Sequence, residues 1–443
     1  MFTALPKVRP GDRVAVMSPS TAAPARFPAV HALAMRRLRE EFGLEPVEYP
    51  TTRRLDASPQ DRAADLMAAF ADPGIRAVLA TIGGDDQITV LPHLDPGVVV
   101  ACPKPFAGYS DNTNLLNWLW NLGVPSYHGG STMVHLGRGG RLHPASSGSL
   151  RAALMDGGDL DLRPVEVFNE DELDWNDPEA LGQEPSTQPA PGWIWHQPGR
   201  MVTGPAWGGC LEILHWNLAA GRWVRPAEDY AGCILLLETS EEMPSAEETF
   251  RMLRNFGERG LLAQFPAILV ALAKAGGIGH PALPEERARY REEQRAAILR
   301  ALGRYNPGAM VVYNLEFGHT DPQWVLPYGG TITRPRCTVA GAQKVSLPVY
   351  PASARASVMR RQVRCRFHSS GRAPSRFWTE AAVVSAVRTD CESMTAADGS
   401  RSRPAAWRAR ARSRSWTFRR VPGPPWLAGG IAGQLGAGLA YPN

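Results

Sequence analysis

Three polar residues in this chain each follow an apolar run that predicts a buried strand. They are Ser110, Glu238 and His319. A serine hydroxyl becomes an effective nucleophile when a histidine removes its proton, and a carboxylate can fix the tautomer of that histidine and stabilise its charged form. The residue types therefore indicate acyl transfer. Their spacing does not bring them together, because Ser110 lies in the first half of the chain and the other two lie in the second.

Ser110 lies where a predicted strand turns into a predicted helix. Residues 98–100 and 106–109 are expected to be extended chain, whereas 112–122 has apolar residues at helical spacing, with Asp111 suited to cap its first turn. A hydroxyl at such a junction lies beside the free N–H groups of the helix. This is the setting of a nucleophile elbow, although the GxSxG pattern is absent. A serine and an aspartate that only cap the helix are the alternative.

The elements before Ser110 alternate between strands and helices. The expected strands are 13–17, 46–49 and 77–82, and the expected helices are 31–42 and 59–70, the second capped by Ser58. This alternation predicts a parallel sheet covered on both faces, with ligands at the carboxyl ends of its strands. Gly83, Gly84 and Ser110 all fall at such ends.

The second half of the chain repeats the pattern. The expected strands are 233–237, 267–272 and 310–315, and the expected helices are 245–256 and 284–302. A polar, proline-rich segment separates the halves. We therefore expect an α/β protein with an N-terminal domain at 1–165, a linker or loop at 166–200 and a C-terminal domain at 201–350. Trp193 and Trp195 in the linker could stack on a flat ligand or pack between the domains.

Composition limits the class of protein. The 443 residues are enough for two domains, and 44% hydrophobic with 21% charged residues is typical of globular proteins. No apolar run is long enough to span a bilayer, and the N-terminus lacks the apolar core of a signal peptide. We expect a cytoplasmic protein with no membrane partner. Six cysteines without a CxxC pair argue against a structural zinc site and a disulfide framework.

The charge is unevenly distributed. Residues 351–443 contain 16 arginines, no lysine and four acids, a balance of +12, which leaves −7 for residues 1–350 of the total of +5. The body of the protein thus gives no reason to expect a nucleic-acid partner. Residues 351–443 also lose strand and helix periodicity and predict a disordered or non-native tail; a nucleic-acid-binding arm is the alternative.

Several motifs together resemble one known family. They are ATIGGDD at 80–86, GYSDNT at 108–113, WGGCLE at 207–212, LETSEE at 237–242 and FGHTD at 317–321 followed by LPYG at 326–329. In this order they resemble the LD-carboxypeptidase family of serine peptidases, which includes muropeptide LD-carboxypeptidases and microcin C immunity peptidases. The resemblance covers residues 8–348.

The resemblance implies a flavodoxin-like N-terminal domain, a smaller α/β C-terminal domain and a homodimer. It also implies a Ser-His-Glu triad of Ser110, His319 and Glu238 between the domains, with the backbone N–H groups of Gly84 and Asp111 as the oxyanion hole. Glu242 is the rival for the carboxylate role, because it lies four residues further on. No metal or organic cofactor is implied.

The resemblance leaves the substrate open. Residues 81–86 are more like the microcin-immunity branch, which implies cleavage of an aminoacyl-nucleotide or peptide-nucleotide. The muropeptide branch implies removal of a terminal D-alanine from a murein peptide. Cys210 stands where many members have asparagine. The alternative from a different functional class is a non-catalytic ligand-binding protein with the same fold.

Four further side chains are weaker candidates. Asp85 and Glu212 could meet a substrate amine, or could be a cap or a solvated charge. His128 and His135 could bind a metal, but no cluster of acids or histidines accompanies them in the sequence, so structural histidines are expected.

Overall fold

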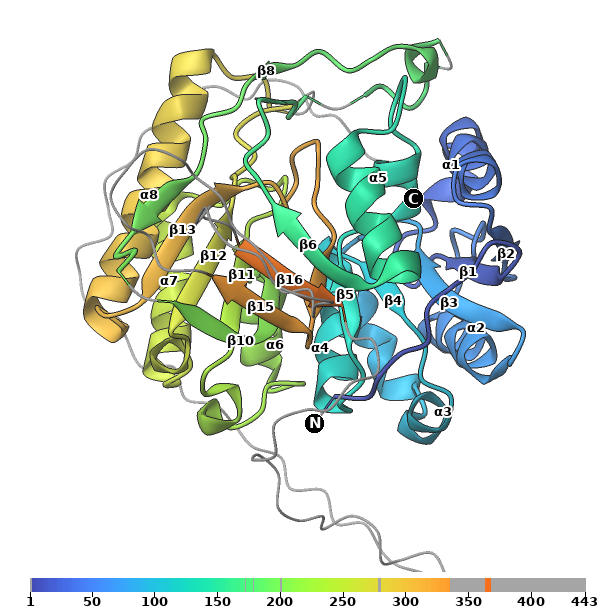
Figure 1. Ribbon diagram of the computed structural model, residues 1–443, viewed down its shortest axis with the longest axis horizontal. Helices are drawn as coiled ribbons and strands as arrows, with labels where there is room; N and C mark the ends of the chain where they lie inside the picture. Colours follow the sequence, from blue (N-terminus) through green and yellow to red (C-terminus); the bar gives the residue numbers. More distant parts are fainter. Residues whose placement is uncertain are drawn as a thin grey trace, which may run out of the picture. The chain divides into compact units, whose positions relative to one another are not determined.

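The computed structural model describes residues 2–171, 173–177, 179–199, 201–277, 280–334 and 363–367, the last range as backbone only. The described residues form two large sheets with helices packed on them, and one sheet of two short strands (Figure 1). This confirms the predicted α/β class. Within the described part, no helix is both long and apolar enough to cross a membrane.

The first sheet has six strands in the order β14-β5-β4-β3-β1-β2. The strands are β1 (Arg13–Met17), β2 (Glu45–Glu48), β3 (Ile75–Ala80), β4 (Phe106–Gly108), β5 (Ser126–His128) and β14 (Leu326–Tyr328). The helices of this half are α1 (Pro28–Glu40), α2 (Pro59–Ala71), α3 (Pro96–Ala101), α4 (Thr113–Asn121) and α5 (Pro144–Arg151). All neighbouring strands are parallel except β14 and β5, so the predicted parallel sheet is confirmed with one antiparallel edge.

The second sheet has eight strands in the order β6-β16-β15-β10-β11-β12-β13-β9. The strands are β6 (Gly158–Leu162), β9 (Ile194–His196), β10 (Val202–Cys210), β11 (Ile234–Glu238), β12 (Ala267–Ala271), β13 (Met310–Leu315), β15 (Thr331–Arg334) and β16 (Val363–Phe367). Its helices are α6 (Leu211–Ala220), α7 (Ala246–Glu258) and α8 (Pro284–Tyr305). Strands β10 to β13 are parallel, and every other pair is antiparallel.

Two strands lie in a different sheet from most of their half of the chain. Strand β6 comes from residues 1–165 but belongs to the second sheet, and β14 comes from residues 201–350 but pairs with β5 of the first. The described residues between 2 and 334 belong to one compact unit. The predicted domain boundaries at 165 and 201 stay predictions. Between β6 and β9, the hairpin strands β7 (Val167–Phe168) and β8 (Gln188–Pro189) lie within the predicted linker.

One prediction about local structure is wrong. Residues 98–100 are helical rather than extended, because they lie in α3, where Pro96 is the first helical residue and Asp95 accepts a hydrogen bond from the Gly97 N–H at 2.7 Å. This cap outweighs the strand preference of three valines. Most of the predicted disordered tail lies outside the described residues. The described residues of this segment form β16, which pairs with β15 and β6.

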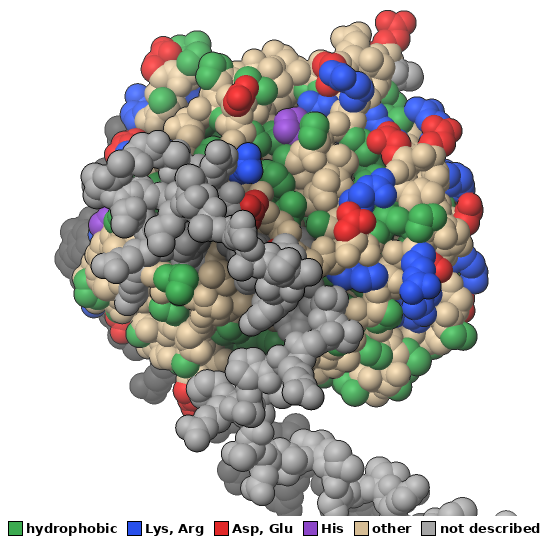
Figure 2. All heavy atoms as spheres, viewed as in Figure 1, with side chains coloured by type: hydrophobic (Ala, Val, Ile, Leu, Met, Phe, Trp, Pro, Cys, Tyr) green, Lys and Arg blue, Asp and Glu red, His purple; other side chains and the backbone are tan. Residues whose placement is uncertain are grey.

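Helix α4 fixes the region around Ser110 between the two sheets. Eight of its nine residues are buried, and one continuous apolar cluster contains residues of α4, β10 and α6. The Trp207 indole N–H donates to Asn117 Oδ1 at 3.0 Å, which ties β10 to α4. The start of α4 therefore cannot shift without disturbing the core. On the face shown in Figure 2, described acidic and basic side chains are interspersed.

Candidate active site

Ser110 has a strained backbone. It begins a 3₁₀ turn, Ser110–Asn112, between β4 and α4, and its φ is +59°. A non-glycine residue in this left-handed region costs roughly 1–3 kcal/mol, and such strain often marks a functional turn. The predicted junction of strand and helix is thus observed, with the hydroxyl-bearing residue in the conformation expected of a nucleophile elbow.

The Asp111 side chain does not cap α4, which corrects the prediction. No side-chain cap is formed at either the turn or the helix. Instead the buried carboxylate accepts hydrogen bonds from Ser20 Oγ at 2.5 Å, the Gln87 N–H at 2.9 Å and Asn114 Nδ2 at 2.8 Å. Burial raises the pKa of Asp111 to about 6. Gln87 supplies the missing cap, because its Oε1 accepts from the Leu115 N–H at 3.0 Å.

His319 is bound to Glu238. Its Nδ1 lies 2.7 Å from Oε2 of Glu238, which is 2% exposed at the end of β11. Burial alone would lower the pKa of His319, but the carboxylates of Glu238 and Glu241 raise it well above its ordinary value. Gly318 permits this approach, since a Cβ there would lie 2.9 Å from the Ala271 Cβ and 3.3 Å from the Glu238 Cβ.

Glu241, which was not a candidate from the sequence, is the second carboxylate at His319. Its Oε2 lies 3.0 Å from Nε2 of His319, and its side chain is 58% exposed. The surrounding protein raises the pKa of Glu241, but the charges of His319 and Lys274 outweigh this effect and lower it to about 2. Glu242, the predicted rival of Glu238, makes no such contact with His319 in the described structure.

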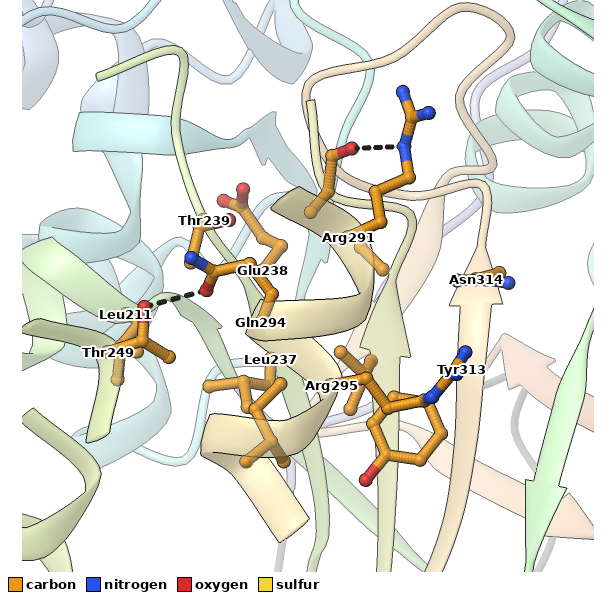
Figure 3. A pocket seen from close by; sticks show the side chains of 14 residues that line it. Leu211, Leu237, Glu238, Thr239, Thr249, Arg291, Gln294, Arg295, Tyr313 and Asn314 are labelled. Carbon is orange, nitrogen blue, oxygen red and sulfur yellow. Dashed lines mark hydrogen bonds between the residues drawn. The ribbon is translucent and has the colours of Figure 1, made fainter. Parts of the chain in front are cut away.

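One large cavity brings the two halves of the site together. Its volume is about 790 Å³, and both Ser110 and His319 line it. The ring centroids of Tyr109 and His319 are 4.9 Å apart, so the imidazole lies beside the residue that precedes Ser110. A second cavity, which Glu238 lines with residues of α8 (Figure 3), has a volume of only about 20 Å³. It has room for about one water molecule and is too small for a substrate.

The predicted oxyanion donors flank the Ser110 side of this cavity. A Cβ at Gly83 would lie 3.2 Å from the backbone N of Asp111, and Gly84 lines the cavity next to it. Gly84 has a φ of +156°, and a Cβ there would lie 2.2 Å from Ser20 Oγ and 2.5 Å from Thr21 Oγ1. Only glycine fits this close approach.

Four predicted substrate contacts do not line the large cavity. Trp193 is 2% exposed and donates its indole N–H to Glu316 at 3.0 Å, while Trp195 lies on the edge strand β9. Glu212 is buried and accepts two hydrogen bonds of 2.8 Å from the N–H and Oγ of Ser240. Asp85 is exposed after Gly84. These four side chains are therefore not part of the site proposed below.

Each of the two candidate metal ligands has one ring nitrogen next to a backbone group. His128 Nε2 lies 3.1 Å from the Phe317 carbonyl oxygen, and His135 Nε2 accepts from the Gly130 N–H at 3.3 Å. Burial lowers the pKa of both, that of His135 to about 4. Among the residues that the structure describes, no group of three potential ligands could hold a metal ion.

The predicted linker forms a wall of the cavity. Asn169 and Asp321 exchange backbone hydrogen bonds of 2.6 and 2.8 Å, and Arg138 contacts both Asp321 and Glu184 at 2.8 Å. Trp175, in the same segment, packs its ring edge-on against Phe27 at 5.2 Å between centroids, and both residues line the cavity. Sequence reasoning missed these contacts because they depend on where the segment folds back.

Comparisons with known proteins agree with this architecture. The fold is shared with a MccF-like protein from Streptococcus pneumoniae that was solved in complex with AMP, at 26% identity and a TM-score of 0.64 over 73% of this chain and 96% of that one. Residues 14–129 match the model of the LD-carboxypeptidase N-terminal domain, and residues 203–333 match that of the C-terminal domain. The chain therefore belongs to the LD-carboxypeptidase family, which is a peptidase family.

The relatives similar in sequence to this chain are named for two different activities. The microcin C7 self-immunity protein MccF of Escherichia coli is 27% identical over 44% of this chain and 56% of that protein. A protein of Bacillus subtilis named as a probable murein peptide carboxypeptidase is 25% identical over 72% of this chain and 87% of its own length. Matches to two other relatives, from Vibrio cholerae and Bacillus subtilis, span only 39% of the length of each.

Proposed function

We propose that the protein is a serine peptidase that hydrolyses the amide-type bond of an aminoacyl-nucleotide or peptide-nucleotide. One observation carries the proposal. Ser110, in its left-handed turn, lines the same cavity as His319, whose Nδ1 lies 2.7 Å from the buried Glu238 carboxylate. Membership of a peptidase family supports it, and the matched ranges include all three residues.

The mechanism assigns one role to each residue. Nε2 of His319 takes the proton of Ser110 Oγ while that oxygen attacks the substrate carbonyl, and the backbone N–H groups of Gly84 and Asp111 hold the resulting oxyanion. His319 then gives the proton to the leaving nitrogen, whose bond to the acyl carbon breaks. Water attacks the acyl-enzyme by the same route, releasing the acid and restoring Ser110. Glu238 orients His319 and stabilises its imidazolium form.

The cavity supports a substrate with a flat aromatic part. Its volume is about 790 Å³, and Trp175 and Phe27 are on its wall. A nucleobase stacks on such rings with about 1–3 kcal/mol of favourable free energy. The relative from Streptococcus pneumoniae binds AMP in its solved structure. We therefore assign the stacking role to Trp175, in place of Trp193 or Trp195.

Removal of a terminal D-alanine from a murein peptide is the second candidate function. The name of the Bacillus subtilis relative that aligns over 87% of its length favours it. A non-catalytic binding protein is the third, and it predicts that every ligand is recovered unchanged. Homodimerisation, a cytoplasmic location and the lack of a cofactor stay predictions.

The test incubates the protein with an aminoacyl sulfamoyl adenosine and measures released nucleoside together with intact protein mass. The wild type and Ser186→Ala should release nucleoside, because Ser186 is an exposed serine on the same cavity wall. Ser110→Ala should release none. Equal release by Ser110→Ala would exclude the serine mechanism. No release by the wild type, with turnover of a murein tetrapeptide, would establish the second function.

A further inference from the structure

His319 lies between two carboxylates in this structure. Glu238 contacts Nδ1 at 2.7 Å, and Glu241 contacts Nε2 at 3.0 Å. A carboxylate can only accept hydrogen bonds when ionised, so each contact is favourable only if the facing nitrogen carries a proton. Both nitrogens are protonated only in the imidazolium form. The observed arrangement is therefore that of a positively charged His319.

An imidazolium cannot act as the base that the proposed mechanism requires. Nε2 is the nitrogen that would receive the proton of Ser110, and in this structure its neighbour is Glu241. Nε2 is buried and makes no hydrogen bond of regular geometry with the described residues, so its contact with Glu241 is an ion pair. Before catalysis, Glu241 has to move away and Nε2 has to lose its proton.

We propose that Glu241 keeps His319 protonated in the free enzyme. When a substrate ammonium group binds Glu241, this carboxylate moves away from His319, and Nε2 of His319 loses its proton. This inference rests on the proposed function, because it concerns the same site. It makes Glu241 a specificity-determining residue that selects substrates with a free, protonated amino group next to the scissile carbonyl.

The position of Glu241 fits this role. In an aminoacyl group the α-nitrogen is two bonds from the carbonyl carbon that Ser110 attacks, and Nε2 has to lie within hydrogen-bonding distance of Ser110 Oγ. A carboxylate 3.0 Å from Nε2 is therefore near the place where the ammonium enters. Glu241 lines the cavity, and its 58% exposed side chain is free to change rotamer at little cost in packing.

Four of the other acids on the cavity wall pair with arginines, and one of these is Asp171, which contacts Arg287. Glu170 is paired with Arg287 at 3.2 Å and also with Arg291. Asp321 and Glu184 are paired with Arg138 at 2.8 Å. These acids hold the wall, whereas Glu241 forms an ion pair with His319 itself. A cation that binds Glu241 thus acts directly on the base.

Other titratable groups near this pair come from several elements. They are Tyr109 before the turn, His128 on β5, Glu238 at the end of β11 and Lys274 after β12. Burial keeps His128 neutral by lowering its pKa and raises that of Tyr109 well above its ordinary value. Glu238 favours the charge on His319 in both states, so Glu241 is the carboxylate whose movement changes it.

The proton balance is simple. In the free enzyme, one proton is on Nδ1 and one is on Nε2 of His319. When the substrate ammonium pairs with Glu241, the buried imidazolium loses one of two stabilising charges, and the Nε2 proton passes to bulk water. The neutral Nε2 then accepts the Ser110 proton. One positive charge enters the site as one leaves.

The test compares the wild type, Glu241→Gln and Glu242→Gln, using an aminoacyl sulfamoyl adenosine and its N-acetylated form. Glu242 is the matched control, because it is an adjacent exposed acid that does not line the cavity. The wild type and Glu242→Gln should prefer the free amine by about tenfold in kcat/KM. Glu241→Gln should hydrolyse both forms alike, and the acidic limb of its pH profile should move to lower pH.

A second readout does not depend on turnover. In NMR titrations of the free proteins with labelled histidine, the pKa of His319 should fall in Glu241→Gln and stay unchanged in Glu242→Gln. The inference is overturned if Glu241→Gln keeps both the amine preference and the wild-type His319 pKa, or if Glu242→Gln shows the same changes. If the wild type hydrolyses neither substrate, the proposed function fails, whereas normal hydrolysis with an unchanged pKa overturns only the role of Glu241.

Discussion

Gly83 packs its backbone directly against the side chain of Ser110. A Cβ at position 83 would lie 2.8 Å from the Ser110 Cβ and 3.0 Å from its Oγ. Ser110 itself has a left-handed φ of +59°. The loop after β3 and the turn after β4 thus pack together. Because Gly83 has no side chain, there is room for the hydroxyl of Ser110.

Gly83→Ala should therefore reduce kcat with little effect on folding. The added methyl group has to displace the Ser110 Cβ and Oγ with it, and a shift of about 1 Å in a reacting atom costs about 100-fold in rate. Steady-state kinetics and circular dichroism of the variant test this. Gly182→Ala is the control, because a Cβ there meets nothing within 4 Å. Wild-type kcat in Gly83→Ala would show that Oγ does not occupy this position during catalysis.

The activity of the wild type should rise with pH. The carboxylates of Glu238 and Glu241 raise the pKa of His319 well above its ordinary value of 6.5, although burial opposes them. The base has to be neutral, so the active fraction of free enzyme grows as pH rises through the raised pKa. A plot of kcat/KM against pH should have its acidic limb above 6.5. A limb below that value would mean that His319 is not charged in the free enzyme.

The Glu238→Gln variant tests which carboxylate orients His319. Because Glu238 Oε2 lies 2.7 Å from Nδ1, replacing it by an amide removes the charge that stabilises the imidazolium and allows the wrong tautomer. We expect kcat/KM to fall by about a thousandfold or more. Glu242→Gln should stay within about twofold of the wild type, as is usual for exposed charges. The opposite pattern would transfer the orienting role to Glu242.

Arg138 should matter for substrate binding. It joins the wall segment to the rest of the site through Asp321 and Glu184, both at 2.8 Å. Arg138→Met should loosen this wall and raise KM about tenfold with a smaller change in kcat. Arg141→Met is the matched control, because Arg141 also contacts Glu184 but is 92% exposed. Equal KM values for the two variants would argue that the wall does not contact the substrate.

Local sequence patterns predicted most elements well, because the signals that define them are local. Strands 13–17 and 310–315 have the expected bounds, and Ser58 caps α2 by accepting a hydrogen bond from the Asp61 N–H at 3.1 Å. Such caps and apolar runs depend on residues a few positions apart. The junction at Ser110 was predictable for the same reason.

The misses involve partners distant in sequence. Asp111 looked like a cap, but it accepts from Ser20 and Gln87, which other loops bring to it. The contact of Glu241 with His319 depends on how the loop after β11 turns, and the sequence offered only its nearness to Glu238. Likewise, β14 pairs with β5 across about two hundred residues, so no local pattern shows it.

Glu316 should make the stability of the protein depend on pH. Its side chain is 1% exposed and accepts hydrogen bonds from the Trp193 indole at 3.0 Å and the Val165 N–H at 3.2 Å. Burial raises the pKa of Glu316 from 4.5 to about 7. The folded protein therefore binds a proton more tightly than the unfolded chain. The stabilising contribution of the protonated Glu316 carboxyl is fully present below pH 4.5 and is lost as the pH rises through about 7.

Urea unfolding at a series of pH values tests this. Between about pH 5 and about pH 8, the free energy of unfolding of the wild type should decrease by a few kcal/mol relative to that of Glu316→Gln, which cannot ionise. Other titrating groups contribute equally to both proteins, so the difference isolates Glu316. Glu166→Gln, at an exposed acid, should follow the wild type. If Glu316→Gln and the wild type have the same pH slope, the carboxyl of Glu316 does not titrate differently in the folded and unfolded states.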